Sequence, residues 1–296
     1  MITNFNLFII RKYMFDYNKA FSRNIWLVSL AEQEKIKNFT IAIPGMGWVG
    51  SNHLIALVRQ GFQNFKIADF DEYEIHNFNR QYWAKIKNIW KNKAATMIDE
   101  VLQINPDCKI ELFDQWINPD NIDDFLEWVD LSIDALDIFV PHARRLFFNT
   151  SHAKKIPVIT AGPMWFSFAG VIMMPEGPNF DQYFCVDDNT SDEELILHFA
   201  LWLSPSLLHA KYMRNVSLEE KSWPSSIAWV LAASSFIVTN ALRVLLWWKG
   251  LKPLPYSHQF DYRKNKYACN RLNFWLNTPW QKMKLKIAIK MVSKKN

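Results

Sequence analysis

A glycine-rich turn between an apolar strand and an apolar helix constrains the fold of this chain more than any other stretch. The run Phe39–Ile43 predicts a short buried strand that ends before Pro44. The turn then contains three glycines: Gly45, Gly47 and Gly50. An apolar helical stretch extends to Arg59, and a second predicted strand ends at Asp69. This order of strand, glycine loop, helix, strand and acid is typical of a Rossmann-type phosphate loop.

Each part of this pattern has a chemical reason. Glycines allow a tight turn and a close approach of the backbone to phosphate, while the free N–H groups and the dipole at the start of the helix favour an anion. Asp69 follows Gly50 by nineteen residues, where a carboxylate at the end of the second strand can accept hydrogen bonds from ribose hydroxyls. The sequence therefore predicts a nucleotide site.

The residues after this acid distinguish the loop from that of an ordinary dehydrogenase. Residues 69–81 begin with D-F-D and end with N-F-N-R-Q. This stretch resembles the ThiF/MoeB/ubiquitin-activating superfamily, whose members read D-x-D, a short spacer and N-x-x-R-Q. The resemblance implies an enzyme that uses ATP to adenylate a carboxylate, with release of pyrophosphate. It also implies an α/β fold with a Rossmann-like, doubly wound, mainly parallel sheet that continues into an antiparallel and helical C-terminal extension.

The resemblance implies roles for the polar residues around this loop. The nucleotide would be held by seven residues: Gly45, Gly47, Gly50, Asp69, Asp71, Asn77 and Gln81. Arg80 and Lys93 would act in catalysis by binding the phosphates of ATP. Asp137, the last residue of D-A-L-D, would bind Mg²⁺, which usually takes one or two carboxylates together with water and phosphate oxygens. Asp134, the first residue of that motif, would hydrogen-bond locally.

A motif near the N-terminus also resembles the family. Residues 21–25 read F-S-R-N-I where the family has Y-x-R-Q-I. In the family this arginine crosses the dimer interface to the phosphates of the partner's ATP. The resemblance therefore implies that Arg23 takes part in catalysis in the partner subunit and that the protein is a homodimer.

One position in the loop departs from the family pattern. The family loop normally reads G-x-G-G-x-G, and here Trp48 occupies the fourth position. Its indole either blocks the approach of the backbone to the phosphates or points away from them, toward the dimer or acceptor side.

We expect four segments along the chain: an N-terminal helical segment at a dimer interface (1–38), a Rossmann-like ATP-binding core (39–175), a C-terminal extension of the same domain (176–280) and a basic tail (281–296). Beyond the first two strands, predicted strands cover 109–113, 129–136, 156–162 and 258–262. Predicted helices cover 92–104, 119–127, 141–155, 193–203, 205–213 and 226–248. The acidic stretch 181–194 is predicted to be a surface loop, at the place of the family's crossover loop.

Charge and hydropathy narrow the choice of partners. The last sixteen residues carry six lysines and no acid, so removing them changes the net charge from +5 to −1. A nearly neutral body makes nucleic acid an unexpected partner. The apolar run 227–248 contains Asn240 and Arg243, so we expect a buried or dimer-facing helix and no membrane. Without a recognisable signal peptide, we expect a reducing cytoplasm.

The cysteines limit the metal and thiol chemistry. Cys108, Cys185 and Cys269 are scattered and cannot supply the two C-x-x-C pairs that hold zinc in several family members, so we expect no zinc site. Cys185 is close to the expected crossover loop and is the candidate for a thioester. A structural role is favoured for it because no base lies nearby in the sequence.

The acyl substrate stays open at this point. It could be the C-terminus of a carrier protein, a peptide or a small acid. A related alternative is a tRNA threonylcarbamoyladenosine dehydratase, since those enzymes share the glycine loop, N-x-x-R-Q and D-A-x-D. A third alternative is a non-catalytic module that binds a nucleotide or a partner.

Overall fold

A single sheet organises the computed structural model, which describes residues 15–209, 224–272, 279, 283 and 286. The strand order is β3-β2-β1-β4-β5-β6-β7-β8. The parallel strands are β1 (Thr40–Pro44), β2 (Asn64–Ala68), β3 (Lys109–Phe113), β4 (Leu131–Asp134) and β5 (Val158–Met164). Three antiparallel strands extend the sheet beyond β5: β6 (Ser167–Met173), β7 (Tyr256–Asp261) and β8 (Lys266–Arg271). The predicted fold class is confirmed.

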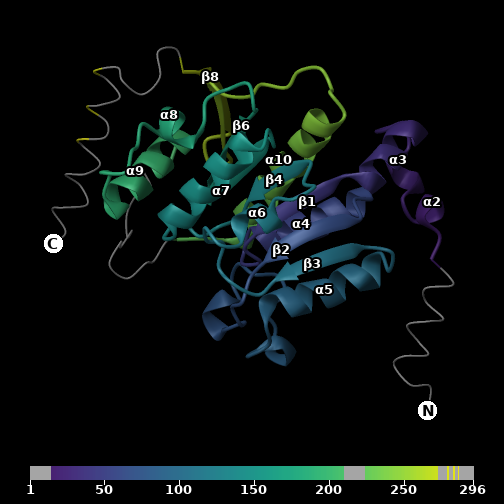
Figure 1. Ribbon diagram of the computed structural model, residues 1–296. Coiled ribbons are helices and arrows are strands. Elements are labelled where there is room, and N and C mark those ends of the chain that lie inside the picture. The colour runs from purple at the N-terminus through teal and green to yellow at the C-terminus, as the bar shows by residue number, and fades with distance from the viewer. Residues whose placement is uncertain (1–14, 210–223, 273–278, 280–282, 284–285, 287–296) are drawn as a thin grey trace.

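Helices cover both faces of the sheet (Figure 1). One buried apolar cluster involves α4 (Gly50–Gln60), α5 (Lys93–Ile104) and α10 (Ile227–Leu245). A second cluster involves α6 (Ile122–Phe125), α7 (Pro141–Ala153), α8 (Phe180–Phe184) and α9 (Asp192–Leu203). On β1, Ile41 and Ile43 belong to the first cluster and Ala42 to the second. This strand is therefore buried on both sides, as is usual in a parallel sheet.

The N-terminal part packs against the end of α4. It contains α2 (Tyr17–Ala20), a 3₁₀ turn (Ser22–Asn24) and α3 (Leu30–Asn38). The Tyr17 hydroxyl donates to the carbonyl of Gly61, which ends α4 in the left-handed conformation with φ +99°. The dimer interface expected for this segment stays a prediction.

Several predicted elements needed correction. The helix expected over 119–127 is only α6, and the strand expected over 129–136 is only β4. The acidic stretch 181–194 is not all loop, because Asp181 lies in α8 and residues 192–194 form the first turn of α9. Ser191 begins α9 with a capping box to Glu194, a local signal that favours a helix start. Residues 205–209 are not helical, and the rest of the helix expected over 205–213 lies outside the described residues.

The longest helix, α10, is the described helix whose length and apolar composition would allow it to cross a membrane. It packs against α4 and against strands β5 and β6, and 56% of its most apolar window is buried. Asn240 is buried in it and donates to the carbonyl of Phe236 at 2.8 Å. These contacts make α10 a core helix of the α/β domain, as expected for the run 227–248.

Candidate active site

The glycine loop closes against the turn that follows β4. Gly45 has φ +98°, and a Cβ there would lie 2.5 Å from the carbonyl oxygen of Ala135. A Cβ on Gly50 would lie 1.8 Å from the carbonyl oxygen of Gly45. A Cβ on Gly47 would meet no atom of the described residues within 4 Å. Gly45 and Gly50 are therefore required by the packing of the loop itself, whereas Gly47 leaves one side of the loop open to a ligand.

Asp69 connects the end of β2 to the glycine loop. Its Oδ2 accepts the N–H of Met46 at 2.6 Å, and its Oδ1 accepts the N–H of Asp71 at 2.8 Å. Burial raises the pKa of this carboxyl group. Each carboxylate oxygen can accept more than one hydrogen bond, so these contacts leave capacity for ribose hydroxyls.

Lys93 lies beside Asp69, at the start of α5. Asn92 caps the helix by accepting the N–H of Ala95, which is why the helix begins at this lysine. The Lys93 ammonium donates to Oδ2 of Asp71 at 3.0 Å, and the Lys93 N–H donates to the Asp71 carbonyl at 2.8 Å. The lysine side chain is 8% exposed and the aspartate 50%. The structure thus joins the predicted phosphate-binding lysine to the D-x-D motif through an ion pair.

Arg80 and Asp137 form the other side of the site. The Arg80 guanidinium donates to the carbonyl of His76 at 2.6 Å and to Oδ1 of Asn79 at 3.0 Å. Burial lowers the pKa of Arg80, and the negative charge of Asp137 opposes that shift, so the two groups act on each other electrostatically. Asp137 is exposed and accepts the N–H of Phe139 at 3.0 Å.

This donor set fits Mg²⁺. Asp137 presents an exposed carboxylate at the carboxyl end of a parallel strand, and Mg²⁺ takes its remaining ligands from water and phosphates. Within the ranges that the structure describes, no group of three or more His, Cys, Asp or Glu could hold a metal by protein ligands alone.

Asn77 and Gln81 support the backbone more than they line the site. Both are buried. Oδ1 of Asn77 accepts the N–H of Glu74 at 3.0 Å, and the Asn77 carbonyl accepts the N–H of Gln81 at 2.8 Å. Oε1 of Gln81 has no hydrogen-bond partner among the described residues. Their contacts shape the loop that carries Arg80.

Trp48 packs against the core of its own chain. Its side chain is half-buried and lies against the apolar cluster that includes α4 and α10. Its carbonyl accepts the side-chain amide of Asn52 at 2.8 Å, one turn into α4. The indole therefore packs on the core of its own chain, and the Trp48→Gly variant tests its effect on the phosphates.

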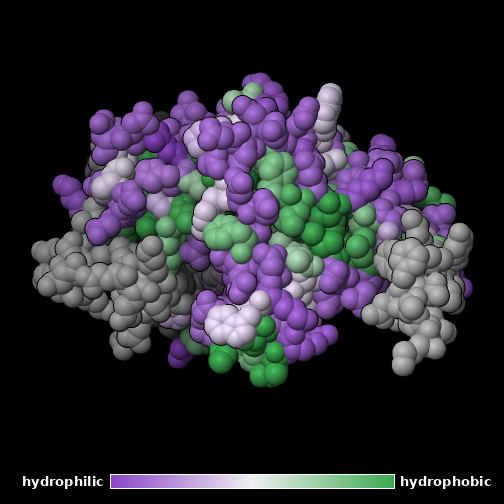
Figure 2. Space-filling model, turned by 60° about the horizontal axis from the view of Figure 1, so that its bottom comes forward, coloured by the Kyte–Doolittle hydropathy of each residue, from purple (hydrophilic) through white to green (hydrophobic). Residues whose placement is uncertain are grey.

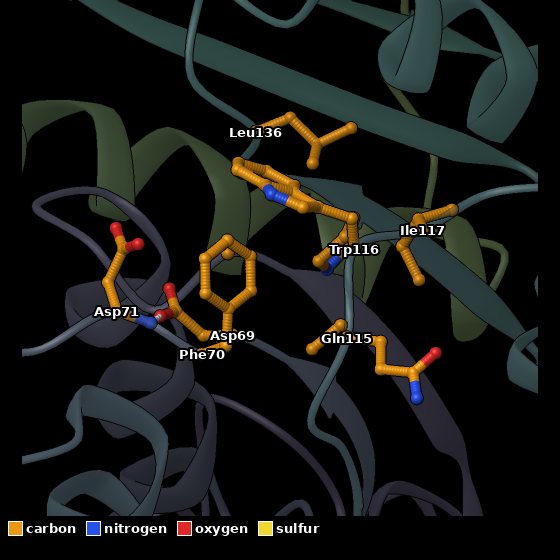
Figure 3. A pocket seen from close by; sticks show the side chains of 10 residues that line it. Asp69, Phe70, Asp71, Gln115, Trp116, Ile117 and Leu136 are labelled. Carbon is orange, nitrogen blue, oxygen red and sulfur yellow. Dashed lines mark hydrogen bonds between the residues drawn. The ribbon is translucent and has the colours of Figure 1, made fainter.

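The structure adds a small cavity that the sequence did not predict. It has a volume of about 30 Å³ and is lined by Pro44, Gly45, Ala68, Asp69, Phe70, Asp71, Gln115, Trp116, Ile117 and Leu136. The rings of Phe70 and Trp116 meet edge to face, with centroids 4.7 Å apart (Figure 3). Residues 114–118 follow β3, so their place at the carboxyl edge of a parallel sheet was the available signal.

Arg23 lies outside the site of its own chain. It is exposed in the 3₁₀ turn Ser22–Asn24. The adjacent Asn24 donates to the carbonyl of Gln60, the last residue of α4. The glycine loop is at the opposite end of this helix, about 15 Å away at 1.5 Å per residue.

Cys185 ends α8 in the left-handed conformation, with φ 54° and ψ 53°. Its side chain is half-buried, and its Sγ lies 3.8 Å from the carbonyl oxygen of Gln182. These contacts suit the structural role favoured above, and they leave the thioester untested.

Comparison with known proteins places this geometry in a family. The pattern of the ThiF family matches residues 21–276. A tRNA threonylcarbamoyladenosine dehydratase of Escherichia coli (strain K12) is 33% identical over 123 residues, which are 41% of this chain and 45% of that protein. A probable molybdopterin-synthase adenylyltransferase of Porphyra purpurea is 31% identical over 112 residues, which are 38% of this chain and 29% of that protein. Each match thus spans less than half of the curated relative.

A solved structure agrees with the fold. The crystal structure of E. coli MccB with MccA has a TM-score of 0.63 at 17% identity, covering 86% of this chain and 71% of that chain. At this identity the likeness concerns the fold. The family pattern, in contrast, extends over most of the sequence and includes the glycine loop, N-x-x-R-Q and D-A-L-D. The chain belongs to the ThiF family.

Proposed function

We propose that this protein is an ATP-dependent adenylyltransferase that activates a substrate carboxylate as an acyl-adenylate and releases pyrophosphate. One observation carries the proposal: a continuous set of contacts joins the charged residues around one edge of the sheet. The loop contacts Asp69 through Met46, Asp69 contacts Asp71, and Asp71 contacts Lys93. The groups expected to hold a nucleotide thus lie side by side although they come from different elements.

The reaction is an in-line attack by a carboxylate oxygen on the α-phosphorus of ATP. The bond to the bridging oxygen breaks, and pyrophosphate leaves with that electron pair. Arg80 and Lys93 would neutralise charge on the phosphates, and the N–H groups after Gly45 would hold the α-phosphate. Mg²⁺ bound at Asp137 would further neutralise the leaving pyrophosphate. The protein would position the two reactants and carry out no covalent chemistry of its own.

The aromatic pair suggests where the base binds. Phe70 and Trp116 are 39% and 48% exposed, next to Asp69, the expected ribose ligand. An aromatic side chain can stack on a base, and such stacking contributes about 1–3 kcal/mol per base. We therefore place the adenine at this pair, which would open from its edge-to-face contact to admit the ring.

The surface beside Arg80 supports a macromolecular partner. The segment that carries this arginine exposes four large apolar side chains: Ile75, Phe78, Ile86 and Trp90. Figure 2 shows hydrophobic surface on the lowest projecting part of the molecule. We propose a homodimer in which Arg23 reaches the partner's site, because this arginine lies a helix length from its own loop. A carrier protein or peptide would present the carboxylate.

A second candidate is a tRNA-modifying reaction of the dehydratase type. The identity to the E. coli tRNA threonylcarbamoyladenosine dehydratase favours it. The charge of −1 outside the last sixteen residues speaks against a nucleic-acid surface. A non-catalytic nucleotide-binding module is the third possibility to be tested.

ATP–pyrophosphate exchange tests the three possibilities together. The purified protein is incubated with ATP, Mg²⁺ and labelled pyrophosphate, alone or with peptides and small proteins ending in Gly-Gly, with small acids or with threonylcarbamoylated tRNA. Exchange that depends on a peptide or carrier supports the proposal, and exchange that depends on the tRNA supports the dehydratase-type reaction. Nucleotide binding without exchange under any of these conditions would identify a non-catalytic module.

A further inference from the structure

Two neighbouring arginines of α7 turn to different parts of the molecule. The Arg145 guanidinium pairs with Asp181 of α8 at 2.6 Å and with Asp188 in the following loop at 2.8 Å. Arg144 instead points into the protein and is 4% exposed. Its Nε donates to both oxygens of Asp134, at 3.3 and 3.1 Å, and its Nη2 donates to the carbonyl of Leu136. Arg144 therefore contacts both ends of the short stretch that leads to Asp137.

Other contacts immobilise this arrangement. The Thr160 hydroxyl on β5 donates to Oδ2 of Asp134 at 2.8 Å, and the N–H of Leu136 donates to Oδ1 at 3.1 Å. The Phe199 ring on α9 covers the guanidinium, with its centroid 4.3 Å from Cζ of Arg144. The aromatic face attracts the cation and limits its rotation. Asp134 is thus held from β5, and the guanidinium is held from the C-terminal extension.

The turn 135–137 lies beside the glycine loop, the small cavity and Arg80. A Cβ at Gly45 would lie 2.5 Å from the Ala135 carbonyl oxygen, and a Cβ at Gly50 would lie 2.9 Å from Cβ of Ala135. Leu136 lines the cavity beside Phe70. Asp137 follows directly, in the electrostatic field of Arg80. A small displacement of this turn would therefore move the loop support, the cavity wall and the expected magnesium ligand together.

We propose that Arg144 is a positioning residue for the Mg²⁺–nucleotide site, acting through the turn 135–137 and held in place by Phe199. This inference rests on the proposed function. Burying an ion pair has a desolvation penalty that an apolar pair of similar volume would avoid, so stability alone is a poor reason for it. A guanidinium has several donors in a fixed planar fork, and this geometry lets one side chain hold both Asp134 and the Leu136 carbonyl.

Through the contact with Phe199, the C-terminal half of the chain would also take part in positioning the site. Phe199 belongs to α9, which begins within the acidic stretch 181–194 at the place of the family's crossover loop. The C-terminal extension would thus help to set the metal ligand through α9.

The test compares Arg144→Lys with the matched control Arg145→Lys on the same helix. Lysine keeps the charge beside Asp134, but its one nitrogen cannot occupy the positions of both Nε and Nη2. We expect Arg144→Lys to raise the Mg²⁺ concentration that half-saturates nucleotide binding by about tenfold, as is usual when a supporting contact of a metal ligand is lost. ATP binding in the presence of EDTA should weaken by a smaller factor, because the loop support and the cavity wall move with the turn. Arg145→Lys should leave both measurements at the wild-type level.

Calorimetric titration with ATP, with and without Mg²⁺, gives these values independently of turnover. An unchanged Mg²⁺ requirement in folded Arg144→Lys would overturn the proposal. If that variant does not fold, Phe199→Leu decides, since it preserves apolar volume and removes only the ring above the guanidinium. It should raise the Mg²⁺ requirement by a smaller factor, and no change would overturn the proposal. If the wild-type protein itself bound no Mg²⁺–ATP, the proposed function would fail first.

Discussion

The parallel and antiparallel halves of the sheet are organised by different contacts. At the carboxyl edge of the parallel strands, Asp69 and Asp134 each accept the backbone N–H of the residue two positions further along the chain. The antiparallel half also contains a polar contact between buried side chains that are far apart in the sequence. Gln259 of β7 lies 2.9 Å from His209, whose ring stacks on Trp165 with centroids 5.4 Å apart.

We therefore expect the two halves of the sheet to have different roles, with nucleotide chemistry in the parallel half and stability in the antiparallel half. The strand ends of the parallel half carry the charged groups of the proposed site, so changes there should affect nucleotide chemistry more than folding. The buried polar contacts of the antiparallel half face protein, so changes there should affect stability and leave nucleotide affinity intact. Substitutions in the two halves test whether this separation holds.

We expect the largest effect on ATP–pyrophosphate exchange at Asp137, the proposed Mg²⁺ ligand. Asp137→Ala removes an exposed carboxylate, so the fold should remain while ATP–pyrophosphate exchange falls by about 100-fold or more, as for other single electrostatic contributors. Arg80→Ala should behave in the same way. Exchange rates and melting temperatures are measured on both variants and the wild type. Exchange at the wild-type rate in either variant would remove that residue from the site.

Substitutions at the two outer glycines, Gly45 and Gly50, should affect both stability and nucleotide chemistry. In this loop the two roles therefore overlap. A Cβ at Gly50 overlaps the Gly45 carbonyl, so Gly50→Ala should lower the free energy of unfolding by about 1–3 kcal/mol, as overpacking does, and should disrupt the loop. Gly47→Ala is the matched control, since its Cβ meets no described atom within 4 Å. Urea unfolding should show Gly47→Ala at wild-type stability, while titration with ATP shows a loss of affinity. Equal stability of the two variants would contradict the loop geometry.

In the antiparallel half, acid should destabilise the protein through His209. Burial lowers the pKa of His209 to about 4, with a further contribution from Lys264. Because the unfolded chain binds this proton more tightly, the stabilisation is complete above about pH 6.5 and is lost as the pH falls toward 4.

Between pH 7 and pH 5 this histidine should reduce the free energy of unfolding by about 2 kcal/mol. His209→Gln should remove that part of the pH dependence and leave ATP affinity unchanged. Urea unfolding at the two pH values measures the effect. An identical pH dependence in the variant and the wild type would show that another group is responsible.

We expect only a small effect on ATP affinity at Trp48, which lies in the glycine loop and packs into the core. Trp48→Gly should lower the melting temperature, because the half-buried indole is lost from the apolar cluster. Its ATP affinity should stay within about twofold of wild type. A clear gain in affinity would mean that the indole obstructs the phosphates.

Features of the fold that depend on residues close together in the sequence were predicted correctly. The strand expected over 109–113 is β3, the helix expected over 92–104 is α5 with its cap at Asn92, and Asp134 bonds locally as expected. These features depend on neighbouring residues in a repeating strand–helix order. The strand β8 was not predicted, since its residues KYACNR are partly or fully exposed and lack an apolar alternation.

Among the site residues, those brought together only by the folded sheet were missed. The resemblance to the family implied that Arg80 and Asp137 share one site, and in the structure the negative charge of Asp137 acts on Arg80. Trp116 was missed because only the folded sheet brings the end of β3 beside Phe70.

The sequence by itself determined the family, the fold class and the nucleotide loop, because all three depend on glycines, acids and apolar runs at fixed separations. The tertiary structure decided that Trp48 turns toward the core, that Arg23 lies a helix length from its own loop, and that Arg144 supports the turn before Asp137. The physical reason is distance along the chain. Spacing describes contacts between neighbouring residues, whereas contacts such as that between Arg144 and Phe199 exist only after helices have packed on the sheet.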